Sequence, residues 1–184
     1  MSFATSAGFV ARVRALRRDR RGVAAIEFAV FLPLLLILCL GTFEVGQGIS
    51  INLNNNLAAR TVADLASQYT TIFNADMNNI LCASTTVMAP YPTQPLSVTV
   101  SEVKVDDNGN ATIVWSDSQN GTAHAVGAPV TLPAGLNVPR SYLIWGETQY
   151  VYTPSLGYVL TGSITLSNQI FMSPRVPSVQ RTNS

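Results

Sequence analysis

A single carboxylate, Glu27, interrupts the most apolar stretch of the chain, which runs from Val23 to Phe43. A charged side chain is costly in lipid, so an ionisable residue in such a run is expected to have a partner and a function. A rival interpretation places Glu27 at the cytoplasmic interface, where its side chain snorkels to water and the helix dipole favours its charge. Residue type alone leaves both interpretations open.

The other polar residues do not form a recognisable catalytic or metal-binding motif. The chain has one histidine, His124, and no pair of cysteines beside it, so we expect no metal site. The sequence signatures of serine hydrolases, zinc proteases and nucleotide-binding loops are absent. We therefore expect that the protein is not an enzyme and uses no cofactor.

An acidic cluster at 106–110, with the sequence DDNGN, fits either a calcium loop or a hairpin turn. A calcium loop of the EF-hand type needs a glutamate at its twelfth position, and Asp117 stands there instead. Asn-Gly between alternating apolar residues is typical of a hairpin turn. The turn is the preferred interpretation.

Charge is distributed unevenly along the chain. Residues 1–21 contain six arginines and one acid, whereas the chain after Gly22 has five basic and nine acidic residues, within a net charge of +1. A basic stretch could bind nucleic acid, but beside an apolar run the positive-inside rule explains it better. We expect a cytoplasmic N-terminus, an extracytoplasmic C-terminal part and no nucleic-acid partner.

The apolar run is long enough to cross a membrane, because 21 residues of helix span about 31 Å against roughly 30 Å of hydrocarbon. A cleavable secretory signal is the rival interpretation, with weak cleavage sites at 41–43 and 46–48. The length of the run and the helical pattern beyond it favour an anchor. The expected organisation is a basic leader (1–22), a transmembrane helix (23–45) and an extracytoplasmic domain (46–184).

The two cysteines, Cys39 and Cys82, are not expected to form an intramolecular disulfide. Cys39 lies in the predicted membrane helix, where a cysteine is a small apolar filler, and Cys82 lies in the aqueous domain. Cys82 could pair between chains or be buried, and burial is the preferred expectation.

Apolar residues recur every three to five positions up to Phe73, which predicts one helix of 51 residues, about 76 Å long, over 23–73. Pro33 should kink it modestly. Asn74 is the expected N-cap of a second helix that reaches Val87.

Alternation with a period of two predicts four strands, at 96–105, 111–116, 142–152 and 164–172. A change of phase near 101–102 indicates a β-bulge. Residues 117–139 are expected to form a long loop and 176–184 a loose tail, and 158–161 are ambiguous. Trp115 and Trp145 are expected in the sheet core.

Four strands cannot bury their apolar face alone, so the outer half of the long helix is expected to cover them. The predicted fold class is α+β, with a long N-terminal transmembrane helix whose outer half packs on a small antiparallel sheet.

Residues 20–29, with the sequence RRGVAAIEFA, resemble the processing site of type IV pilin precursors. In those precursors a membrane peptidase cuts after a glycine and leaves glutamate at the mature fifth position. The resemblance implies cleavage after Gly22, a new amine on Val23, and an assembly role for Glu27 and Phe28. A glycine before the cut has no side chain to obstruct the protease.

More specifically, residues 20–64 resemble the TadE-like family, pseudopilins of the tight-adherence (Flp) pilus. The likeness rests on the following residues: Arg21-Gly22, Ala25 to Ala29, Leu32 to Leu35, Gly41, Glu44, Gly46 and Ala58 to Arg60. TadE-, TadF- and TadG-like members share this N-terminal pattern, so the subfamily stays open.

The TadE-like resemblance implies a minor pseudopilin in the bacterial inner membrane, with its domain in the periplasm and a role in pilus assembly and cell adhesion. The implied partners are a prepilin peptidase, other pilus subunits, the inner-membrane assembly platform and membrane lipid. Glu27 would pair with the amine of Val23 on the same or a neighbouring subunit. The alternative is an uncleaved, signal-anchored periplasmic binding or adhesion module, and the two hypotheses differ at the bond after Gly22.

Overall fold

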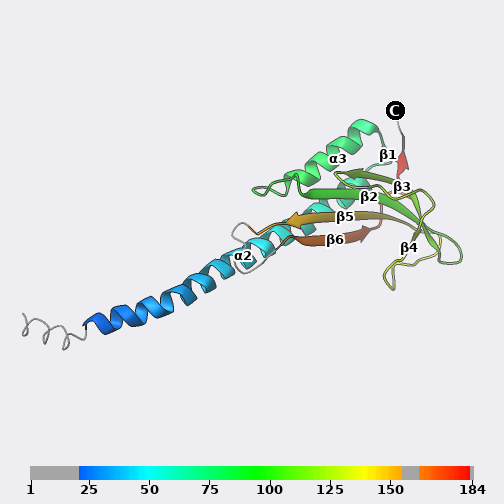
Figure 1. Cartoon of the computed structure of the whole chain (residues 1–184). Coiled ribbons are helices and arrows are strands. Elements are labelled where there is room, and N and C mark those ends of the chain that lie inside the picture. The colour runs from blue at the N-terminus through cyan, green and yellow to red at the C-terminus, as the bar shows by residue number, and fades with distance from the viewer. Residues whose placement is uncertain (1–20, 155–161, 183–184) are drawn as a thin grey trace, which may run out of the picture.

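A computed structural model describes residues 21–154 and 162–182, and Figure 1 shows a long helix that leads into a domain built on a sheet. The expected basic leader and the ambiguous segment 158–161 lie outside the described residues, apart from positions 21 and 22. The elements, in chain order, are α2 (Arg21–Ser67), β1 (Thr71–Ile72), α3 (Asn74–Thr86), β2 (Leu96–Val105), β3 (Ala111–Gln119), β4 (Pro129–Val130), β5 (Tyr142–Tyr152), β6 (Ile164–Met172) and β7 (Gln180–Arg181).

The α+β prediction is confirmed: the outer half of α2 packs on an antiparallel sheet. The strand order is β4-β3-β2-β5-β6, and all neighbours in it are antiparallel. Strands β2, β5 and β6 have the predicted bounds, whereas β3 continues to Gln119. The short strand β4 lies in the segment that was expected to be a loop, where it pairs with the start of β3.

Helix α2 has 47 residues, about 70 Å by helical rise, and continues through Pro33. The prediction that it reaches Phe73 is wrong: α2 ends at Ser67, and the backbone at and after its end bonds to the C-terminal segment. Ser67 O accepts the backbone N–H of Arg175 at 3.0 Å, and Thr70 O accepts that of Gln180 at 2.9 Å. The chain therefore leaves the helix to form the parallel pair of β1 and β7.

The expected loose tail at 176–184 is also wrong over the residues that the structure describes. Val179 is completely buried in the main core, and β7 extends the chain alongside β1. Residues 183 and 184 lie outside the described part.

Helix α3 begins at Asn74, so its N-cap lies one residue earlier than predicted. Phe73 occupies the N-cap position, and its backbone N–H donates to the Asp76 carboxylate at 3.1 Å. The buried face of α3 carries Met77, Ile80, Leu81 and Ser84. Cys82 points away from this face and is exposed, so the expectation of its burial is wrong.

The turn between β2 and β3 confirms the hairpin interpretation of the acidic cluster. Asp106 Oδ1 accepts the backbone N–H groups of Asn108 and Asn110 at 2.8 and 2.7 Å, and Oδ2 accepts the Asn110 side-chain amide at 2.9 Å. These bonds, that of the Asn110 amide foremost, lower the pKa of Asp106.

The predicted bulge is present, but the extra residue belongs to β3. Glu102 pairs with Trp115 and Val103 with Ile113, which leaves Val114 without a partner in the ladder. Along β2 the alternation itself continues unbroken. The apolar residues change phase because the sheet has an apolar cluster on each face: Val98 and Val100 face the helices, whereas Val103 and Val105 belong to a second cluster.

Candidate functional site

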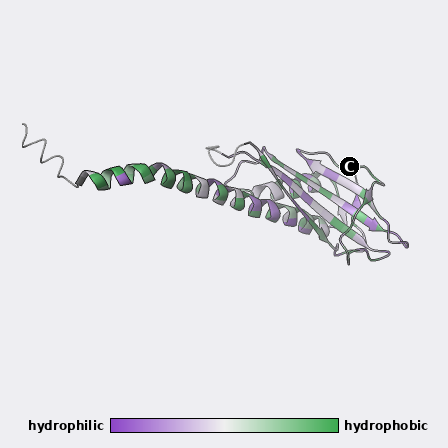
Figure 2. Cartoon of the chain, turned by 60° about the horizontal axis from the view of Figure 1, so that its bottom comes forward, coloured by the Kyte–Doolittle hydropathy of each residue, from purple (hydrophilic) through white to green (hydrophobic). Residues whose placement is uncertain are grey.

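The half of α2 before Phe43 is apolar and touches little of the described molecule. Figure 2 shows this half as mainly hydrophobic, whereas the half beside the sheet is mixed. Within the described residues, α2 is the one helix long and apolar enough to cross a membrane, and its most apolar window has no buried surface. Side chains in this window are exposed from Val23 to Leu38.

The four residues predicted for processing and assembly lie together at the inner end of α2, far along the helix from the sheet (Figure 1). Val23 is 51% exposed and Phe28 is 60% exposed. A Cβ atom built on Gly22 would meet nothing within 4 Å. Val23 and Glu27 are four positions apart, which places them on one side of the helix, about 6 Å apart along its axis.

The outer half of α2 approaches the sheet closely where both surfaces carry small residues. A Cβ atom added to Gly146 on β5 would lie 2.5 Å from the Ala59 carbonyl oxygen and 3.0 Å from Ala63 Cβ. Ala58, Ala59 and Ala63 are buried in this contact region. A glycine in a strand often marks such a close approach of another backbone.

A row of asparagines on α2 binds the edge strand β6. Asn55 is completely buried, and its side-chain amide donates to the Leu166 carbonyl oxygen at 2.9 Å. Asn56 donates to Asn168 Oδ1 at 3.3 Å, and Asn168 in turn donates to Asn52 Oδ1 at 3.0 Å. The helix thereby satisfies polar groups along an edge that would otherwise offer a template for strand pairing.

The junction between the exposed half of α2 and the domain lies at Glu44. The Tyr152 hydroxyl, at the end of β5, donates to the Glu44 carbonyl oxygen at 3.0 Å. Glu44 is buried, and a Cβ atom on Gly48 would lie 3.3 Å from the Tyr152 ring. Burial raises the pKa of Tyr152.

A second glutamate, Glu102, is completely buried beneath the C-terminal segment. Its carboxylate accepts the Val179 backbone N–H at 2.6 Å and the Ser178 hydroxyl at 3.4 Å. The Trp115 indole donates to Val179 O at 2.8 Å. Burial raises the pKa of Glu102, although hydrogen bonds from Val179, Ser178 and Trp115 counteract the effect.

Arg181 holds the same segment to the hairpin. Its side chain makes two bonds to the Asp117 carboxylate, at 2.8 and 3.2 Å, and a third to Asn74 Oδ1 at 2.8 Å. A two-bonded arginine–carboxylate pair with little exposure is stronger and more specific than an ordinary surface pair. The C-terminal segment therefore closes the open end of the layer between helix and sheet.

His124 does not belong to a metal centre within the described residues, where no group of three or more potential ligands occurs. Its Nε2 lies 2.5 Å from Glu147 Oε2, and its ring stacks on Trp145 with centroids 4.8 Å apart. Trp145 also stacks on Phe171. Trp115 is buried in the main core, as expected, whereas Trp145 is only partly buried and packs against the second cluster.

Sequence reasoning missed two residues that join helix to sheet, Asn55 and Gly146, and two that hold the C-terminal segment, Glu102 and Arg181. The amide run at 52–56 was visible as an unusual feature of an amphipathic helix. The remaining three gave no local signal, because the partners named above lie between 64 and 107 positions away.

Comparison with known proteins gave a match over the N-terminal helix. Residues 22–64 match the family model described as TadE-like protein, and this segment lies within α2. The resemblance to the TadE-like family is confirmed over this segment, and it supports a protein associated with the Tad pilus that has a single-pass membrane anchor. A search of curated proteins and a search of solved structures gave no match.

Proposed function

We propose that the chain is a minor pseudopilin of a tight-adherence (Flp-type) pilus, cut by a prepilin peptidase after Gly22 and assembled through α2. The observation that carries this proposal is the match of residues 22–64 to TadE-like proteins, together with the glycine and the glutamate at its start. The partners that it requires are the peptidase, other pilus subunits and the inner-membrane platform.

The length of α2 supports an inner-membrane position with the domain on the far side. From Val23, about 30 Å of hydrocarbon corresponds to some 20 residues of helix. This distance ends near Phe43, and contacts with β5 begin immediately afterwards at Glu44. The arginines before Gly22 favour a cytoplasmic N-terminus, so the domain from residue 46 would stand in the periplasm at the membrane surface.

The position of Glu27 supports an assembly role. Cleavage after Gly22 would create a positive amine on Val23, one helical turn before the carboxylate. The pair would offset the cost of a charge in lipid, within one subunit or between neighbours. A peptidase could reach this bond without displacing the sheet, because the described contacts of the domain begin about twenty residues later.

The test is mass spectrometry of the N-terminal peptide, after the full-length protein has been co-expressed with an active prepilin peptidase. We expect a mature chain that begins at Val23, and an uncut chain when the peptidase active site is inactivated. Gly22→Leu should block the cut while membrane insertion continues, and Gly46→Leu on the same helix is the matched control that should still be cut. An intact arginine-rich leader in the presence of active peptidase would contradict the proposal and favour the signal-anchored binding module.

A further inference from the structure

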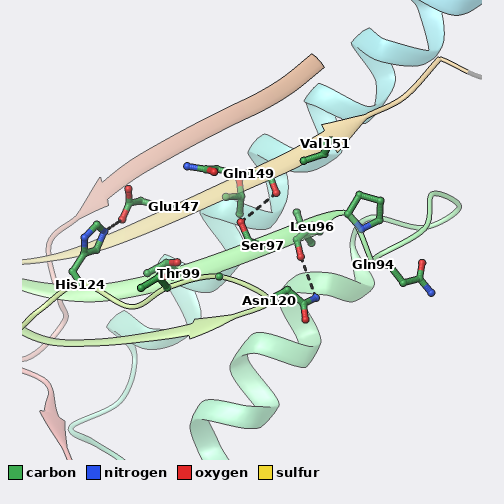
Figure 3. Close-up of a pocket in the computed structure, with 13 residues that line it drawn as sticks. Gln94, Leu96, Ser97, Thr99, Asn120, His124, Glu147, Gln149 and Val151 are labelled. Carbon is green, nitrogen blue, oxygen red and sulfur yellow. Dashed lines mark hydrogen bonds and ion pairs between the residues drawn. The ribbon is translucent and has the colours of Figure 1, made fainter. Parts of the chain in front are cut away.

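A hollow of about 560 Å³ lies on the sheet face opposite α2, over β2 and β5 (Figure 3). Ligand pockets in proteins commonly have volumes between about 300 and 1,000 Å³. Its floor is formed by outward-facing residues of the two strands, Ser97 and Thr99 from β2 and Glu147 and Gln149 from β5. One wall is formed by residues 120–124, which follow β3.

The outer face of this sheet changes character along its length. Toward the β2–β3 turn it is apolar, with Val103 and Val105 packed against residues of the 128–136 loop. Toward the membrane-proximal end the corresponding positions carry hydroxyl, amide and carboxylate groups, and they are left open. A solvated sheet face is ordinarily polar, but here the polar half is also concave because of the wall.

The wall is fixed at several points. Asn120, which has a left-handed backbone (φ 55°), donates from its side chain to the Leu96 carbonyl oxygen at 3.1 Å. The His124 backbone N–H donates to Ser116 Oγ at 3.0 Å, and its ring bonds to Glu147. A Cβ atom on Gly121 would lie 2.8 Å from Ser118 Oγ, so glycine lets the segment pack tightly on β3. The hollow is therefore formed before any ligand binds.

The lining presents neutral hydrogen-bonding groups. Among the described residues of the lining, the ionisable ones are His124 and Glu147, and they bind each other. The side chains of Gln94, Gln149 and Thr122 form no hydrogen bond with the described part of the chain, so they can bind a ligand. Amides and hydroxyls each donate and accept. Val151 and Pro95 add apolar contact at one edge.

We propose that this hollow is a binding site for a neutral saccharide of one or two sugar units. A ligand rich in hydroxyl groups matches a lining whose groups both donate and accept hydrogen bonds. An anionic ligand would find no unpaired cation in the lining, and a lipid chain would leave the polar floor unsatisfied. The site is separate from α2 and does not depend on cleavage after Gly22.

Saturation-transfer NMR on the detergent-solubilised full chain tests the site. The probes are neutral mono- and disaccharides of the gluco, galacto, manno and N-acetylhexosamine types, each at millimolar concentration. We expect binding of at least one of these probes. Gln149→Ala and Thr122→Ala should each weaken it by roughly three- to tenfold, the effect of one hydrogen bond.

Thr131→Ala is the matched control. Thr131 is exposed in the 128–136 loop, outside the hollow, so this variant should bind as the wild type does. Neither Gln149 nor Thr122 has a side-chain partner in the described chain, so both variants should fold, as tryptophan fluorescence would verify. The absence of binding by every probe overturns the proposal. Binding that is unchanged in both variants also overturns it, because the ligand would then occupy another site.

Discussion

The two halves of α2 use one continuous helix in opposite ways. Before Phe43, large apolar side chains are exposed on all sides. After it, the face against the sheet carries mainly small or polar residues, such as Ala59 and Asn55, whereas large apolar residues such as Leu53, at 65% exposed, face outward. Ile51 and Val62 are also buried there, but the outer half departs from the usual arrangement by leaving several large apolar residues exposed.

This difference shows that the residues buried by the outer half of α2 depend on how closely the helix and the sheet can pack, and not on apolar area alone. Small residues allow the backbone of α2 to reach β5, and amides serve the polar groups of β6. The outward apolar residues of the outer half continue the apolar surface of the inner half. Under the proposed function, both surfaces would contact lipid or neighbouring subunits.

The largest expected effect comes from adding a side chain where α2 and β5 lie too close to accommodate one. Gly146→Val should destabilise the domain by about 3 kcal/mol or more, because its Cβ would lie 2.5 Å from the Ala59 carbonyl oxygen. Valine is a good strand residue, so the loss would report the clash. The measurement is urea unfolding followed by tryptophan fluorescence, since Trp115 and Trp145 both lie in the sheet.

Gly46→Ala is the matched control, because nothing lies within 4 Å of its added Cβ and alanine favours a helix by roughly 1 kcal/mol. Equal stabilities of the Gly146 and Gly46 variants would contradict the importance of close approach.

An exchange of residue types tests this distribution of buried and exposed residues directly. Asn55→Leu should cost about 1–3 kcal/mol, because it removes the buried amide that donates to the partly buried Leu166 carbonyl oxygen. The reverse change at an exposed position, Leu53→Asn, should alter the unfolding free energy by less than about 0.5 kcal/mol. If Asn55→Leu proved as stable as the wild type in urea unfolding, the asparagine row would have no role in holding β6.

A smaller, pH-dependent effect is expected at Glu102. Because burial raises its pKa in the folded state, its contribution to stability is present below the unfolded pKa and is lost as pH rises through the folded pKa. Glu102→Gln keeps an acceptor for Val179 and removes the buried charge. The variant should therefore gain stability over the wild type at neutral pH.

The gain of Glu102→Gln should shrink as the pH falls toward the ordinary range of a glutamate. Thermal unfolding of both proteins across this pH range is the measurement. An advantage that is independent of pH would show that charge at Glu102 is not the cause.

The smallest effect on stability is expected in the inner half. Glu27→Ala should leave insertion intact and change domain unfolding by less than about 0.5 kcal/mol, because position 27 is exposed and remote from the sheet. Under the proposed function the same change should reduce pilus assembly, measured by recovery of the protein in sheared pili. Normal assembly of this variant would rule out the pairing of Glu27 with the Val23 amine.

Much of the fold was predictable because its signals are local. The bounds of β2, β5 and β6 follow from alternation, and the hairpin turn follows from Asn-Gly at 108–109. The end of α2 was not predictable, since the helical pattern continues to Phe73 and only hydrogen bonds from the C-terminal segment end the helix at Ser67. Strand β7 was not predicted either, because two residues that pair in parallel leave no periodic pattern.

The sequence alone specifies the apolar anchor, the glycine and glutamate at its start and the residue types of the main strands. These properties depend on neighbours within a few positions. Only the tertiary structure decided which face of α2 binds the sheet, why Gly146 must be small, and how Glu102 and Arg181 hold the C-terminal segment. The physical reason is that these contacts join residues at least 64 positions apart, and the free energy of each depends on a partner that local patterns do not specify.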